Sequence, residues 1–562
     1  MRPPAVLSRV QHGWRGINTA GSEGALMDAA RRILFYNWVA FDDDEKRGGG
    51  VSIYQRNLTE ALVQAGWQVD FFSSGLAFDM ESDTPRFERT DNVFDPACRS
   101  FQMVNSPILS PGHSAFGQND RLFETGPAFD AFLTFLHENG PYDIVHFNNI
   151  EGIPFSFLDL KFHFPDMLIV LSHHNYFAVC PQVNLWQRED HHCTDYNRGK
   201  TCTDCLIHRP PRAEILAAQQ LSTLIKRAGL TAKSPVFLNA FADDSFTDLF
   251  QDLARRTRTE FLQEDALPLD EAEENGFARR RRLAVALLKR SVDLHLAVSQ
   301  RVARVIGSYG IDASRTKVSY IGTKHGETLL TARKRQSAAK PGSLSMVFMG
   351  YMRADKGFLF LLDALEALPP ATARNLRVKL AAKSTGDTKL AARLKALARH
   401  LGALEHIDGY AHADLPAILK DVDIGVVPVL WEDNLPQVAL EIMSHGVPIL
   451  TSDRGGAQEL SGNPDFVFAA GQTLAFAEAI RKLQSGEVAL DGFWTNAMPL
   501  RSMSEHLSEL SQLYETGLAE MAARRTAPAP QNAAPTETLL PESGLMAALP
   551  PSALRNWIVT HA

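Results

Sequence analysis

The sequence predicts an α/β protein built on parallel sheets. Short apolar runs rich in β-branched residues alternate along the chain with helical segments, as in βαβ units. The clearest strand, 423–430 (DIGVVPVL), ends directly in acidic and polar residues, and a helical segment follows it. With 562 residues the chain exceeds what one hydrophobic core usually supports, so at least two domains are expected.

The composition is that of a large globular enzyme. Apolar residues make up 45% of the chain and charged residues 22%. A net charge of −8 argues against nucleic-acid binding, and no apolar run approaches the roughly 18 residues that cross a bilayer. Residues 1–31 lack the apolar core of a signal peptide and are expected to form a loose extension, so a cytoplasmic location is expected.

The first domain is expected over residues 32–322. A strand at 32–38 (RILFYNW) is followed by three glycines at 48–50, a helix over 51–65 and a second strand. Glycines at such a turn let a ligand approach the backbone, and a turn without a ligand is an equal alternative. The acidic residues 42–44 ahead of the glycines are expected to form a solvated loop.

Two histidines follow a later strand of the first domain. Residues 167–172 (MLIVLS) predict that strand, and His173 and His174 stand at its carboxyl end. Open α/β sheets bind ligands outside the carboxyl ends of their strands, so these side chains are candidates for a cleft. A hydrogen-bonded structural histidine is the alternative.

Four of the five cysteines lie within one loop, 180–205, and the last two form a C-x-x-C pair. Four thiolates with one such pair can close a tetrahedral structural zinc site. Reduced free thiols account for the cluster equally well, and disulfides fit a cytosolic enzyme least. The candidate metal ligands are Cys180, Cys193, Cys202 and Cys205.

Residues 210–290 predict a helical insertion with charged connectors. Its segment 277–290 (FARRRRLAVALLKR) is basic and partly amphipathic. Such a helix can lie on an anionic membrane surface, which would suit a lipid-linked acceptor. A solvated helix face is the alternative. A polar linker is expected at 323–343, ahead of a second domain at 344–492.

The stretch after the strand at 423–430 is the strongest functional signal. Asn434 is a plausible N-cap, Pro436 suits the first turn, and the helix that follows ends near His445. Free amides at a helix start attract phosphates. The acidic side chains around this start therefore suit the hydroxyl groups of a ribose or another sugar.

These residues also carry a family pattern. Asp433 and Glu441 are separated by seven residues, and Glu441 opens the run E-x-M-x-x-G-V-P-I-L-x-S-D-x-G-G-x-x-E. The pattern resembles the donor site of retaining GT-B glycosyltransferases of the GT4 type. This resemblance implies two Rossmann-like domains facing each other across a cleft. It assigns the nucleotide ribose to Glu441 and the transferred sugar to Asp433, where the family usually has Glu, with Glu432 as a second candidate.

The resemblance extends to motifs in both domains. It implies that Lys356 neutralises the departing diphosphate. Tyr351 stands where the family has a second cation, an Arg, so that cation is replaced only if Arg353 reaches the diphosphate. When the family pattern H-D-x-W/F-x-x-C-P is aligned on Cys180-Pro181, His174 takes the histidine position and Asn175 stands in place of Asp. The resemblance implies that His174 contacts the donor sugar near the reacting carbon. The other implied donor-binding residues are Gly49, Gly50, Asn434, Leu435, Pro436, Gln437, Gly455 and Gly456. A helix at 493–525 is expected to cross back to the first domain, before a Pro- and Ala-rich tail at 526–562.

The resulting prediction is a retaining glycosyltransferase that moves a sugar from a nucleotide diphosphosugar to a sugar or lipid-linked hydroxyl acceptor. It needs no cofactor for catalysis and serves cell-surface polysaccharide or glycolipid synthesis, with peripheral contact at the inner membrane face. One alternative is a catalytically weakened scaffold or partner subunit, which the departures at Asp433, Asn175 and Tyr351 favour. The other is a sugar-nucleotide epimerase, which requires a pair of acid–base residues that the sequence does not display.

Overall fold

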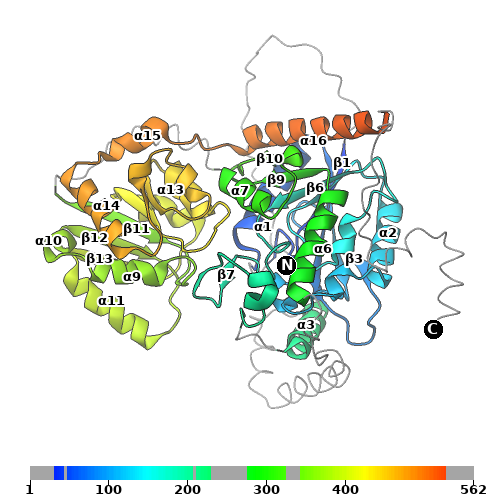
Figure 1. The fold of residues 1–562 in the computed structure, drawn as a ribbon, viewed down its shortest axis with the longest axis horizontal. Coiled ribbons are helices and arrows are strands. Elements are labelled where there is room, and N and C mark those ends of the chain that lie inside the picture. Colours follow the sequence, from blue (N-terminus) through cyan, green and yellow to red (C-terminus); the bar gives the residue numbers. More distant parts are fainter. Residues whose placement is uncertain (1–30, 44–46, 207–210, 230–274, 325–341, 527–562) are drawn as a thin grey trace, which may run out of the picture.

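The computed structural model describes residues 31–43, 47–206, 211–229, 275–324 and 342–526. They form two lobes, each built around a mainly parallel sheet with helices on its faces (Figure 1). The predicted α/β class with two Rossmann-like domains is confirmed. The predicted N-terminal extension, most of the linker, the centre of the helical insertion and the tail lie outside the described residues.

The first lobe contains an eight-stranded sheet in the order β10-β9-β6-β5-β1-β2-β4-β3, in which the described β3 runs antiparallel to β4 and the other pairs are parallel. Strands such as β5 and β6 are buried along their whole length, as expected for a sheet covered on both faces. The strands are β1 (Arg32–Tyr36), β2 (Gln68–Ala77), β3 (Arg86–Thr90), β4 (Cys98–Val104), β5 (Ile144–Phe147), β6 (Leu168–His173), β9 (Leu294–Ala297) and β10 (Thr316–Val318). The helices are α1 (Gly49–Gln64), α2 (Pro127–Asn139), α3 (Arg212–Arg227), α6 (Gly276–Ser291) and α7 (Gln300–Ser308).

The second lobe contains a six-stranded parallel sheet in the order β13-β12-β11-β14-β15-β16. The strand order reverses between β11 and β14, which is where open sheets of this kind bind ligands. The strands are β11 (Leu344–Met349), β12 (Leu376–Ala381), β13 (Ala403–Ile407), β14 (Ile424–Val427), β15 (Ile449–Ser452) and β16 (Val467–Phe468). The helices are α9 (Phe358–Glu366), α10 (Pro370–Arg374), α11 (Thr388–His400), α12 (Leu415–Leu419), α13 (Gln437–Ser444), α14 (Thr473–Ser485) and α15 (Phe493–Asn496).

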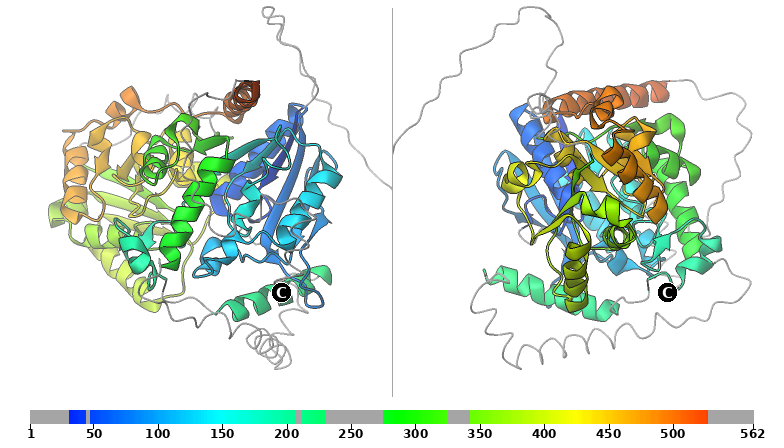
Figure 2. Two further views of the ribbon diagram at one scale, coloured as in Figure 1. Left: turned by 45° about the vertical axis from the view of Figure 1, so that its right-hand side comes forward. Right: turned by 90° about the vertical axis from the view of Figure 1, so that its left-hand side faces the viewer.

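Helix α16 (Met503–Thr526) returns from the second lobe and lies along the first, as Figures 1 and 2 show. The Tyr514 hydroxyl lies 2.6 Å from His146 Nδ1, and His506 Nε2 lies 2.8 Å from the hydroxyl of Tyr54 on α1. Because all four side chains are buried, these contacts fix the end of the second domain to the core of the first.

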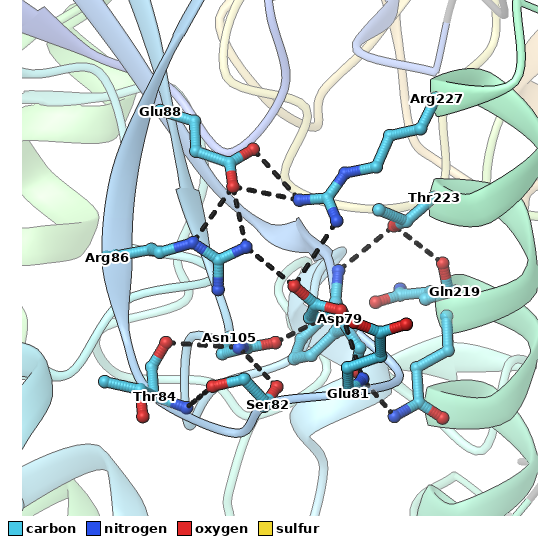
Figure 3. Close-up of polar contacts among 12 residues, drawn as sticks. Asp79, Glu81, Ser82, Thr84, Arg86, Glu88, Asn105, Gln219, Thr223 and Arg227 are labelled. Carbon is cyan, nitrogen blue, oxygen red and sulfur yellow. Dashed lines mark hydrogen bonds and ion pairs between the residues drawn. The ribbon is translucent and has the colours of Figure 1, made fainter.

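A polar network fastens α3 to the edge of the first sheet (Figure 3). Arg86 Nη2 donates to Asp79 Oδ2 at 2.7 Å, and Arg227 of α3 donates to Glu88 of β3 at 2.9 Å. Hydrogen bonds from the Glu81 backbone and from Arg86 lower the pKa of Asp79 to about 2. The described start of the helical insertion is therefore bound to the sheet through charged groups.

Two expectations about charged segments need correction. Asp43 is not solvated, because Arg47 binds its nearly covered carboxylate through both the backbone and the side chain. In α6, Arg280 and Arg281 point into the protein, where Arg281 Nε donates to Val179 O at 2.8 Å. Burial lowers the pKa of Arg280 to about 10. These arginines bind carbonyls of residues 177–179, just before the cysteine-rich loop, so α6 is not simply a solvated face. Contact of its exposed side with a membrane stays a prediction.

Within the part of the chain that the structure describes, no helix has both the length and the hydropathy needed to cross a membrane.

Candidate functional site

A lysine and an aspartate meet at the point where the strand order of the second sheet reverses. Lys356 follows β11, Asp433 follows β14, and Lys356 Nζ lies 2.7 Å from Asp433 Oδ2. The Lys356 ammonium is also 5.0 Å from the centre of the Trp431 ring. Gly357 makes this approach feasible, because its φ is +74° and a Cβ there would come within 1.7 Å of Pro428 O. The fold thus brings together a cation and an acid from separate motifs.

Glu432 is buried in an ion pair between the two domains. Its side chain is 1% exposed, and Arg301 of the first domain donates to both carboxylate oxygens, at 2.7 Å from Nε and 2.5 Å from Nη2. Arg454 Nη1 lies 3.4 Å from Glu432 Oε1. Burial acts to raise the pKa of Glu432, but the hydrogen bonds and charge of Arg301 outweigh it and lower that pKa. The carboxylate of Glu432 is therefore saturated by an interdomain ion pair, and its contact with a donor stays a prediction.

The glycine pair that ends the motif also has a structural task. Gly456 N donates to Asp433 O at 2.8 Å, and Gly455 N lies 3.3 Å from a Glu432 oxygen. Gly455 has a φ of +65°, and a Cβ there would lie 2.1 Å from Asp433 O. These amides hold the 432–434 loop, because the two backbone segments are in direct contact. The donor contact expected for Gly455 and Gly456 stays a prediction.

Two polar side chains of the motif cross to the first domain. Asn434 Nδ2 donates to His173 O at 3.0 Å, and Gln437 Nε2 donates to Gly50 O at 2.7 Å. Asn434 is consequently not the N-cap, and α13 begins after Pro436 without a side-chain cap. The glycine turn at 48–50 and the carboxyl end of β6 therefore both lie against the second domain, with Leu435 buried beside them.

Glu441 lies in a second polar cluster on the same domain. Its Oε1 is 2.8 Å from His412 Nε2. Burial raises the pKa of Tyr410 above its usual value, and the charges of Glu441 and Tyr351 add to that rise. Tyr351 itself is 60% exposed, so the cluster opens to solvent through an aromatic ring.

Arg353 pairs with the buried Asp355. Its Nε donates to Asp355 Oδ1 at 2.9 Å and its Nη2 donates to Oδ2 at 2.7 Å. This bidentate pair anchors the loop after β11, which leaves Lys356 as the cation that contacts Asp433.

His174 follows β6, and its ring lies 5.2 Å from that of Tyr54 on α1. Its Nε2 is buried and makes no hydrogen bond within the described residues. Burial, together with the nearby His506 and His173, lowers the pKa of His174 to about 3. The imidazole is neutral at physiological pH and can donate or accept one hydrogen bond to a ligand, so it remains a candidate contact for the sugar.

Asn175 has a carboxylate partner that its position in the motif did not reveal. Its Nδ2 donates to Glu151 Oε1 at 2.5 Å, and the Gly112 amide donates to the other oxygen. Burial raises the pKa of Glu151 to about 7, although these two hydrogen bonds oppose the rise. Glu151, a carboxyl group with a pKa near neutrality, therefore contacts the residue that directly follows His173 and His174 in the sequence.

The four clustered cysteines are free thiols. Among the described residues, no group of three or more His, Cys, Asp or Glu side chains is arranged to hold a metal ion. Burial raises the pKa of Cys202 to about 12 and that of Cys205 to about 11, and the Cys205 thiol donates to Gln182 Oε1 at 2.8 Å. The thiols of Cys180, Cys193, Cys202 and Cys205 lie close enough to influence one another's pKa. The structural zinc at these four residues stays a prediction beside the reduced-thiol alternative.

Several residues of these polar contacts were given no role by sequence reasoning. Glu459, the last residue of the motif, accepts from the backbone amides that start α7, at 2.9 Å from Gln300 N, and from the Tyr320 hydroxyl at 2.7 Å. Only its place at the end of the motif marks it in the sequence. The others carry no local signal at all: Glu151, Arg301 and His412.

Comparisons with known proteins agree with this arrangement. Residues 343–485 match the family model described as Glycosyl transferases group 1. Spore coat protein SA from Bacillus subtilis (strain 168) is 28% identical over 186 residues, which cover 30% of this chain and 49% of the relative. The chain therefore spans about half the length of that curated relative. The structure of sucrose-phosphate synthase from Thermosynechococcus elongatus matches with a TM-score of 0.50 and 16% identity, over 87% of this chain and 100% of that chain.

Fold and comparisons together define the architecture. Residues 343–485 of the second lobe are similar to group 1 glycosyl transferases, and the two-lobed architecture is that of GT-B proteins.

Proposed function

We propose that the protein is a retaining glycosyltransferase of the GT4 type, which moves a sugar from a nucleotide diphosphosugar to a hydroxyl acceptor without a metal. The observation that carries this proposal is the contact of Lys356 with Asp433 at 2.7 Å, at the switch point of the second sheet. A cation beside an acid suits a ligand with a charged diphosphate and a hydroxyl-bearing sugar.

Each group has a role in the proposed reaction. When the bond between the anomeric carbon and the diphosphate oxygen breaks, negative charge collects on the diphosphate, and Lys356 stabilises it. Asp433 accepts from hydroxyls of the transferred sugar, and Glu441 accepts from the ribose. The acceptor oxygen bonds to the anomeric carbon on the face that the diphosphate leaves. Its proton passes to the departing phosphate oxygen, so the enzyme needs no nucleophile of its own.

The acceptor is proposed to be a sugar chain or a lipid-linked precursor for a surface glycan. The matched Bacillus subtilis relative is named for a spore coat, which is a surface layer. A lipid-linked acceptor would bring the protein to the membrane face at its cytoplasmic side.

Calorimetric titration with UDP, GDP, ADP and their sugars tests the donor site. One nucleotide is expected to bind, and Glu441→Ala should weaken it by about 100-fold, because a charged hydrogen bond contributes roughly 1.5–3 kcal/mol. The matched control is Glu478→Ala, which removes an exposed carboxylate bonded to Arg481 on α14. A folded protein that binds none of the nucleotides would refute the donor site and favour the scaffold alternative.

The stereochemistry is tested separately. Incubation of the bound nucleotide sugar with candidate acceptors should give a product with the anomeric configuration of the donor, as read by NMR coupling constants. Inversion would overturn the retaining mechanism, and epimerised donor formed without an acceptor would favour the epimerase.

A further inference from the structure

A groove of about 730 Å³ lies on the first domain and shares no residue with the donor site. Its walls are residues 193–196 of the cysteine-rich loop, one face of α6 and the end of α7. Its volume falls within the roughly 300–1,000 Å³ of small-molecule sites. It is therefore large enough for a sugar unit and not merely for an ion.

One wall of the groove is cationic. Arg281 and Arg282 line it from one turn of α6 and Lys289 from about two turns further on, and the lining contains a single carboxylate, that of Asp195. Positions that differ by three, four, seven or eight residues share one face of a helix, which explains why these cations gather on one side. The groove thus carries an excess of positive charge in a protein whose net charge is −8.

Arg281 is held rigidly at this wall. Its Nε donates to Val179 O at 2.8 Å, its guanidinium lies 3.5 Å above the centre of the Tyr196 ring, and Tyr309 lies 4.9 Å away. Among the described residues, no carboxylate forms an ion pair with it. A planar guanidinium fixed in place loses little entropy when it binds the oxygens of a phosphate.

The other residues that line the groove have the chemistry that recognises sugars. They are Tyr196 and Tyr309, whose rings adjoin Arg281, together with Thr194, Ser308 and Asp195. Hydroxyl and carboxylate groups bond to sugar hydroxyls, and aromatic rings cover the apolar faces of a sugar.

We propose that this groove binds a phosphorylated saccharide, with the phosphate on the α6 wall and the sugar against the cysteine-rich loop and Tyr309. The loop also reaches the interdomain ion pair, because His192 Nε2 lies 3.6 Å from Glu432 Oε1. The bound ligand therefore sits next to a contact that joins the two domains. The proposal uses no donor-site residue and does not depend on the proposed transfer.

The test is calorimetric titration of the full-length protein with glucose 6-phosphate and, as the uncharged match, glucose. The double variant Arg282→Gln/Lys289→Gln removes two exposed cations of the groove. The control Arg279→Gln/Arg290→Gln removes two exposed cations of the same helix that do not line it. Circular dichroism verifies that both variants fold.

Glucose 6-phosphate is expected to bind, glucose to bind at least tenfold more weakly, and the groove variant to lose at least tenfold in affinity while the control does not. Equal affinities in the two variants, or no binding to the wild type, would overturn the proposal.

Sedimentation with phosphatidylglycerol vesicles, against phosphatidylcholine vesicles, distinguishes the source of the phosphate. Groove-dependent binding to the anionic vesicles without binding of glucose 6-phosphate would overturn the saccharide assignment in favour of a lipid headgroup. Glu441→Ala should leave the affinity for glucose 6-phosphate unchanged, so failure of the donor site and failure of the groove are told apart.

Discussion

Arg301 and Glu432 form an ion pair between the two domains, and Arg301→Met tests how much that pair contributes. Methionine keeps most of the length of the side chain and removes its charge. Glu432 would then keep only the more distant donors, Arg454 at 3.4 Å and the Gly455 amide at 3.3 Å, with His192 at 3.6 Å. A nearly dehydrated carboxylate would be left without its two close hydrogen bonds.

Removing one partner of a buried ion pair costs about 3–5 kcal/mol, because the other charge stays buried and unpaired. Arg301 is 27% exposed and Arg454 remains nearby, so the lower end, about 3 kcal/mol, is expected. Replacing both partners with apolar residues removes the buried charge as well. The double variant Arg301→Met/Glu432→Leu should therefore lie within about 1 kcal/mol of the wild type.

Urea unfolding of the wild type, both single variants and the double variant measures this coupling. The exposed pair on α14 supplies a control, since Arg481→Met should leave the unfolding midpoint unchanged. A single Arg301→Met variant as stable as the wild type, or a double variant as unstable as the sum of the singles, would refute the reasoning.

Three further predictions follow from the same geometry. Lys356→Met should lower kcat by roughly 10²–10³-fold in a donor-turnover assay, with partial rescue by Lys356→Arg, because a charge that faces the departing diphosphate is lost. Gly455→Ala should lower thermal stability by more than 2 kcal/mol, since its Cβ would meet Asp433 O at 2.1 Å, whereas Gly471→Ala, with nothing within 4 Å, should cost only about 1 kcal/mol for its positive φ. Burial raises the pKa of Glu151 from 4.5 to about 7, so the folded protein holds this proton more tightly than the unfolded chain. The stability gained in this way is fully present below pH 4.5, and the free energy of unfolding falls by roughly 3 kcal/mol as pH rises through 7. Glu151→Gln should abolish that part of the pH dependence, and an unchanged stability difference between the two proteins from pH 4 to pH 8 would contradict the assignment.

The element pattern could be predicted from the sequence because it depends on local signals. The apolar run at 423–430 and the alternation of strands with helices reflect periodicities that neighbouring residues define. The spacing of Asp433 and Glu441 is equally local, since both lie within one strand–loop–helix unit. These features were sufficient for the α/β class with two Rossmann-like domains.

The roles of individual side chains depended on contacts between distant segments. Glu432 looks like a ligand contact in the sequence, yet Arg301, 131 positions away, saturates it in the folded chain. Asn434 has the chemistry of a helix cap, but the carbonyl of His173 in the other domain takes its amide. A polar group pairs with whatever partner the packing of the domains brings within about 3 Å, and that distance is set by the three-dimensional structure and by no local pattern.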